Sequence, residues 1–105
     1  MLITVESQIR QLAHSYLRHG GKQNRKKRVD RLCNACKWIA KTFRITDIRQ
    51  IGRRQVWEFY AASSTRKEKT LLEYFYSFEL LWRLLQRAGE PPRPKNRLAP
   101  TNIVD

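Results

Sequence analysis

Two cysteines, Cys33 and Cys36, stand at the C-x-x-C spacing that occurs in redox centres and in half of many zinc sites. The chain has no second cysteine pair, and its two histidines, His14 and His19, fall in a different predicted helix. The pair also lies within a helical pattern of apolar residues, where cysteine behaves as a small hydrophobic side chain. We therefore predict two core-facing thiols in a reduced compartment, and no metal site.

The acidic residues are too scattered for paired acid–base catalysis. Glu73 and Glu79, for example, lie on one predicted helix but do not share a face. The sequence also lacks a Gly-rich phosphate loop, an H-E-x-x-H pair and a G-x-S-x-G elbow. We therefore predict that the chain is not an enzyme, has no catalytic residues, and needs no cofactor or small-molecule substrate.

The charge balance indicates a polyanionic partner. The 105 residues include 22 Lys and Arg against 9 Asp and Glu, which gives a formal net charge of +13. Such an excess destabilises a compact chain by self-repulsion, and nucleic acid is the first candidate to relieve it. A membrane is the weaker candidate, because no apolar run is long enough to span one and the first 19 residues lack a signal peptide. We expect a cytoplasmic protein without a membrane partner.

The basic residues gather at three places, of which two fall in the first turns of predicted helices. Helix amino termini favour phosphate, so cations placed there suggest an anionic partner. Ser63, Ser64 and Thr65 add hydroxyl groups of the kind that bind phosphate oxygens. The predicted DNA-binding residues are Arg25, Lys26, Lys27, Arg28, Arg53, Arg54, Arg66, Lys67 and Lys69.

Apolar residues recur at helical spacing, and no segment alternates with a period of two. The pattern predicts helices over 4–19, 24–43, about 52–62 and 65–88, with a short turn at 46–51. Asn24 is a candidate N-cap, Thr65 and Glu68 match a capping box, and glycines at 20, 21 and 89 would end helices. The sequence therefore predicts an all-α, compact bundle of four to five helices.

Some apolar residues fall outside the main core stripes. The last predicted helix is apolar on two sides, which indicates either a central helix or one that a partner covers. Trp38 falls among cations on the far side of the second predicted helix, and Trp57 and Trp82 are expected in or near the core. The candidate partner interface is Trp38, Tyr76, Leu80 and Leu84.

The order of these signals from Lys26 to Pro94, about two thirds of the chain, resembles a known family. It is similar to the N-terminal SAM-like, core-binding domain of phage-type tyrosine recombinases, or integrases. The segments that carry the resemblance are Arg28-Val29-Asp30-Arg31-Leu32 through Trp38-Ile39, Ile45-Thr46-Asp47-Ile48, Thr70, Tyr74 or Tyr76, Leu81-Trp82, Gly89 and Pro91-Pro92.

The resemblance implies a domain that clamps one side of duplex DNA. It implies contacts from Arg53 and Arg54 and from Arg66, Lys67 and Lys69, flanked by residues 25–28. Integrases cleave DNA with a second domain bearing an Arg/His/Arg/Tyr set, and this chain ends where that domain would begin. No tyrosine here is therefore expected to cleave DNA.

The expected organisation is a leading helix at 1–21, a core-binding domain at 22–90 and a proline-led exit segment with a flexible tail at 91–105. The chain would be either a free-standing relative or an excised integrase domain. A recombinase catalytic domain and a second copy of the chain are candidate partners besides double-stranded DNA.

The sequence is also compatible with two other functions. A helix-turn-helix regulator would read bases from the third predicted helix, which offers Arg53, Arg54, Gln55 and Glu58. A protein-interaction or assembly module would use the apolar stripe of the last helix together with Trp38. Basic composition also leaves RNA as an alternative to DNA.

Overall fold

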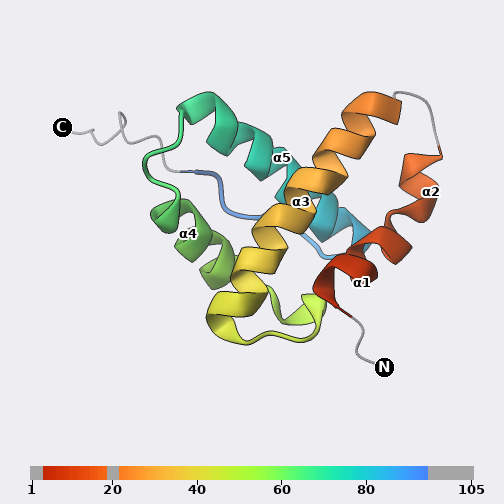
Figure 1. The fold of residues 1–105 in the computed structure, drawn as a ribbon, viewed down its shortest axis with the longest axis horizontal. Helices are drawn as coiled ribbons and strands as arrows, with labels where there is room; N and C mark the ends of the chain where they lie inside the picture. Colours follow the sequence, from red (N-terminus) through yellow and green to blue (C-terminus); the bar gives the residue numbers. More distant parts are fainter. Residues whose placement is uncertain (1–3, 19–21, 95–105) are drawn as a thin grey trace.

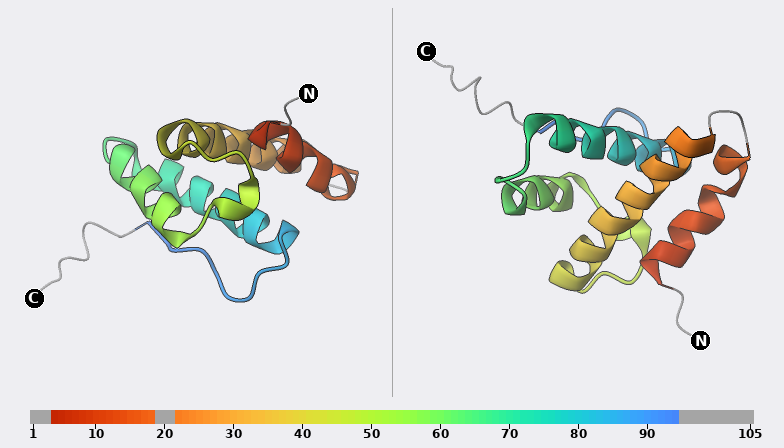
Figure 2. Two further views of the ribbon diagram at one scale, coloured as in Figure 1. Left: turned by 90° about the horizontal axis from the view of Figure 1, so that it is seen from below. Right: turned by 45° about the horizontal axis from the view of Figure 1, so that its top comes forward.

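The computed structural model describes residues 4–18 and 22–94, and within them it contains helices and no strand. The elements are α1 (Val5–Leu12), α2 (His14–Leu17), α3 (Lys22–Phe43), the short 3-10 helix η1 (Ile48–Gln50), α4 (Arg53–Ala62) and α5 (Glu68–Leu84). The predicted all-α bundle is therefore confirmed. Figures 1 and 2 show α1 and α3 in one layer, with α4 and α5 in a second layer beneath α3.

Helix α3 is the central element, because it contacts α1, α2, α4 and α5. Its 22 residues span about 33 Å, at the usual rise of an α-helix. Its buried residues cover a broad arc of the helix, so α3 packs against α1 and α2 beside it and against α4 and α5 in the second layer (Figure 1). The buried set on α3 is Val29, Leu32, Cys33, Ala35, Cys36 and Ile39.

The predicted helix 4–19 is two helices in the structure. Thr4 caps α1 by accepting a hydrogen bond from the Ser7 amide at 3.0 Å. The helix then ends at Leu12, and α2 begins after Ala13. Ala13 is fully buried while Leu12 is exposed, so the core stripe of this region continues through Ala13 and not through Leu12. The prediction that Gly20 and Gly21 end this region lies outside the described residues.

The leading segment shares its core with the rest of the chain. Val5, Ile9 and Ala13 belong to the same hydrophobic cluster as the buried residues of α3, α4 and α5. The expected boundary at residue 21 therefore does not separate two cores.

Two predicted helix starts are wrong. Asn24 lies inside α3, which begins at Lys22. Thr65 does not cap α5, because α5 begins at Glu68 with Lys67 at the N-cap position. A turn held by the hydrogen bond from the Arg66 amide to the Ser63 carbonyl, 2.9 Å, occupies the place where the capping box was expected.

Both long helices end with a residue in the left-handed region. Arg44 and Gln86 each have φ of 56°, and each is followed by an amide that bonds back into the last turn. The amide of Arg87 donates to the Trp82 carbonyl and the amide of Gln86 to the Arg83 carbonyl, which is the Schellman arrangement. Helix α5 therefore ends at Leu84 and not at about residue 88 as predicted.

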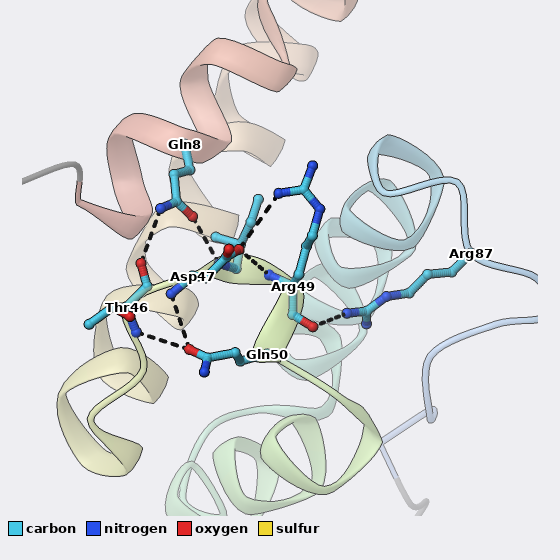
Figure 3. A network of polar contacts seen from close by, with 7 residues as sticks. Gln8, Thr46, Asp47, Arg49, Gln50 and Arg87 are labelled. Carbon is cyan, nitrogen blue, oxygen red and sulfur yellow. Dashed lines mark hydrogen bonds and ion pairs between the residues drawn. The ribbon is translucent and has the colours of Figure 1, made fainter.

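A polar network fixes η1 between the layers (Figure 3). The Gln8 side-chain amide donates to the Thr46 carbonyl at 3.0 Å, and its oxygen accepts from the Ile48 amide at 2.8 Å. Asp47 caps η1 through the Arg49 amide. These bonds tie α1 to a turn 38–40 residues further along the chain, and they hold Ile48 in the core.

The segment after α5 returns along the second layer (Figure 2). Pro91 and Pro92 are buried, and the hydroxyl of Tyr60 donates to the Pro92 carbonyl at 3.0 Å. The guanidinium of Arg93 lies 4.6 Å from the centre of the Phe75 ring. The first residues of the predicted exit segment are therefore packed against α4 and α5, while residues 95–105 lie outside the described part.

Arg87 connects this return segment to η1. Its guanidinium donates to the carbonyls of Ile51 and Arg49, at 2.6 and 2.9 Å, and lies 4.6 Å from the centre of the Trp82 ring. We predict that Arg87→Ala lowers the free energy of unfolding by about 1–3 kcal/mol, because it leaves a part-buried carbonyl without a donor. Arg87→Lys retains the charge but not the two guanidinium donors that reach both carbonyls, so it should recover only part of the lost free energy of unfolding. Urea unfolding followed by circular dichroism measures both, and an unchanged midpoint for the alanine variant would contradict the prediction.

Candidate nucleic-acid interface

The predicted basic cluster at 25–28 is divided by the helix that carries it. Successive residues of an α-helix point about 100° apart, so four in a row cannot share a face. The guanidinium of Arg25 lies 4.4 Å from the Tyr16 ring centre and donates to the Tyr16 carbonyl, toward α2. The guanidinium of Arg28 lies 5.7 Å from the Tyr76 ring centre, toward α5. Lys26 and Lys27 are exposed.

Helix α5 links the cations at its own start to those of α3. Lys69, Leu72 and Tyr76 follow one another along its exposed side, a distance of about 10 Å along the axis. The guanidinium of Arg28, on α3, contacts Tyr76 at the C-terminal end of this row of residues. Arg66 and Lys67, both exposed, lie just before the helix begins. We name Lys27, Arg28, Arg66, Lys67 and Lys69 the α3–α5 basic surface.

These five cations have no carboxylate partner in the described part of the chain. The ion pairs there involve other cations, with Arg10 bridging Glu6 and Asp30 at 3.2 Å each and Lys37 reaching Glu6 at 3.3 Å. Beside the α3–α5 basic surface, Arg31 already neutralises Glu73 at 2.9 Å. The carboxylates of Glu6 and Asp30 are therefore neutralised on the α1 side of α3, whereas the cations of the α3–α5 basic surface have no such partner among the described residues.

The start of α5 adds backbone donors to this surface. Lys67 occupies the N-cap position and provides no side-chain cap. The first amides of an α-helix have no partner within the helix, so those of α5 face outward with the positive end of the helix dipole. Thr65, predicted to satisfy these amides, lies in the preceding turn.

Arg53 and Arg54 lie apart from this surface. They begin α4, whose ten residues span about 15 Å, while Arg66 follows the other end of that helix. The Arg53 guanidinium donates to the Glu90 carbonyl, and the Arg54 guanidinium lies 6.0 Å from the Phe43 ring centre, at the end of α3. The sequence-predicted DNA-binding residues are thus not brought together as one group.

A groove of about 480 Å³ opens between α3 and the turn that joins α4 to α5. Asn34 and Trp38 line it from α3, and Arg66 lines it from the turn. The guanidinium of Arg66 lies 5.3 Å from the centre of the Tyr74 ring. Asn34 and Tyr74 were not predicted as interface residues. The spacing of Lys27, Arg31, Asn34 and Trp38, which places them on one face of a helix, is the signal that could have indicated them.

The predicted partner interface is only partly exposed. Leu80 is 2% exposed and lies in the core, so its assignment to a surface is wrong. Leu84 is half-buried, and Tyr76 alone of the α5 residues in that set is exposed, at 39%. Trp38 was predicted to point away from the core, but its ring packs edge-to-face on Phe59 of α4, with the two ring centres 5.8 Å apart. Trp82 is buried as expected, whereas Trp57 is exposed.

The described residues offer no group of three or more His, Cys, Asp and Glu side chains that could hold a metal ion. None of the described helices combines the length and apolar character needed to cross a membrane. No protein-family model, curated protein or solved structure matches the chain.

The two cysteines are buried and free, as the sequence predicted. Burial raises the pKa of both thiols, so the reactive thiolate is scarce in the folded state. We predict that neither Cys33 nor Cys36 reacts with iodoacetamide at pH 8 in the native protein and that both react in urea. Mass spectrometry counts the adducts, and rapid labelling of the folded chain would contradict this prediction.

Proposed function

We propose that the chain is a non-catalytic DNA-binding domain that docks on duplex DNA through the α3–α5 basic surface. The observation that carries the proposal is the set of cations without carboxylate partners, Lys27, Arg28, Arg66, Lys67 and Lys69, on one side of a chain with a net charge of +13. Phosphate contacts from such cations release counterions, which makes binding favourable and strongly dependent on salt.

The start of α5 supports the same docking mode. Its uncapped amides and the adjacent side chains of Lys67 and Lys69 offer several donors to a phosphate in one place. Tyr76 and Leu72, 39% and 38% exposed, provide apolar contact area between the cations of α5 and Arg28. A sugar–phosphate backbone offers both kinds of contact.

The choice of duplex DNA rests on the resemblance of residues 26–94 to integrase core-binding domains. The all-α fold is compatible with that resemblance. RNA offers the same phosphates, so a duplex RNA of equal length is the competitor that a binding experiment must include.

A helix-turn-helix reading is less well supported by α4. Gln55 accepts a hydrogen bond from the Gly52 amide at 2.8 Å, and Arg53 donates to the Glu90 carbonyl. Two of the four residues expected to read bases are therefore engaged within the chain.

The first test replaces Arg66, Lys67 and Lys69 with alanine. We expect weaker binding to a duplex and a plot of log affinity against log salt that is flatter by up to about 2.7, the value for three lost phosphate contacts. Fluorescence anisotropy with a labelled 20-base-pair duplex at four salt concentrations measures both quantities.

A matched control removes the same charge elsewhere. Arg10, Lys37 and Arg49 are paired with carboxylates, so their triple alanine variant has the same net charge as the test variant but an intact α3–α5 basic surface. If both variants lost the same affinity and the same salt dependence, net charge alone would explain the binding, and the α3–α5 basic surface would be rejected as the docking site.

A second test concerns Arg53 and Arg54. Since they lie at the opposite end of α4 and contact Glu90 and Phe43, we predict that their double alanine variant retains most of the salt dependence of the parent chain. If this variant lost as much salt dependence as the Arg66, Lys67 and Lys69 variant, the duplex would instead contact the start of α4.

A further inference from the structure

The groove between α3 and the α4–α5 turn is lined by two buried residues whose hydroxyl groups have no hydrogen-bond partner among the described residues. Ser63 is 7% exposed and Tyr74 is 6% exposed, and both line the groove. Neither hydroxyl makes a hydrogen bond to any residue in the part of the chain that the structure describes. Buried hydroxyls are nearly always paired, because leaving one unpaired costs free energy. Two in one groove therefore indicate a polar group that binds there.

The other lining residues define the chemistry of that group. Asn34 offers both a donor and an acceptor, and the indole of Trp38 is half-buried with Phe59 behind it. Arg66 provides the positive charge, and no carboxylate lines the groove. Neutral hydrogen-bonding groups suit the edge of a base, an aromatic ring suits its face, and the guanidinium suits a phosphate.

The groove has the dimensions and position for such a ligand. Its volume of about 480 Å³ lies within the usual range for small-molecule sites. Arg66 belongs both to the groove and to the α3–α5 basic surface, so a strand bound on that surface passes the mouth of the groove.

We propose that this groove binds one unpaired nucleotide of a DNA strand, with the base against Trp38 and the adjoining phosphate on Arg66. The proposal rests on the proposed DNA-binding function and names the feature of DNA that this site would select. An unpaired base enters at no cost of unpairing, whereas a base within the duplex must first leave the stack.

The test compares three labelled hairpin duplexes of one sequence with the full chain. The first is fully paired, the second carries a single bulged purine, and the third carries an abasic residue at the bulge. We expect the bulged duplex to bind about tenfold more tightly than the paired one, as stacking of a base on an aromatic side chain provides. The abasic duplex should bind like the paired one, since it retains the phosphate but lacks the base.

Matched variants assign the effect to the groove. Ser63→Ala removes a hydroxyl that makes no hydrogen bond to the described residues, so it should leave the unfolding midpoint unchanged while reducing the preference for the bulge. Ser64→Ala changes an exposed neighbour outside the groove and should retain the preference. Trp38→Leu should abolish the preference and leave affinity for the paired duplex unchanged.

The outcomes separate the two proposals. Equal affinity for all three duplexes, with binding to the paired duplex intact, overturns the nucleotide site and leaves the DNA-binding function standing. A similar loss of preference in Ser63→Ala and Ser64→Ala also overturns the site. Failure to bind any of the duplexes at low salt rejects the proposed function, and the nucleotide site with it.

Discussion

The burial of α3 on several sides is the constraint on which the rest of the structure depends. It contacts α1 and α2 in its own layer and α4 and α5 in the other, so the other four α-helices are all positioned against it. Full burial of its small residues Ala35 and Cys36 allows close packing on both layers. A polar stripe of α3 that includes Lys27, Arg31 and Asn34 stays accessible to a partner. Asn34 lines the groove, and Lys27 and Arg31 line a second hollow that α3 forms with Glu73 and Tyr76 of α5.

The same packing determines which cations pair with carboxylates. Because α1 lies along α3, Arg10 and Lys37 meet Glu6 and Asp30 there. The hydrogen bonds from Arg10 and Lys37 hold the pKa of Glu6 below its usual value, as expected for a carboxylate bound by cations. The side of α3 that faces α5 has one comparable pair, Arg31 with Glu73. On the face where we place the nucleic acid, the five cations of the α3–α5 basic surface have no carboxylate partner among the described residues.

Helix ends were the least predictable part of the fold. Arg44 and Gln86 adopt the left-handed conformation that glycine takes at lower cost, so no residue type marks those ends in the sequence. Thr65 and Asn24 have good capping side chains but do not cap, because the turn at Ser63 and the earlier start of α3 place them elsewhere. The Schellman end of α5 nevertheless has a structural role, since Arg87 follows it and donates to the carbonyl of Arg49 in η1 and to that of Ile51 just after η1.

The sequence alone determined the helical class, the buried thiols and the excess positive charge, because these follow from composition and from periodicity within single helices. It could not determine which cations share a surface. That depends on how α3 turns Arg25 toward Tyr16 and Arg28 toward Tyr76, and on the length of α4, which separates Arg53 from Arg66. Nor could it show that Ser63 and Tyr74 are buried beside the groove that Trp38 lines, since that groove exists only where α3 meets α5 and the turn that follows α4.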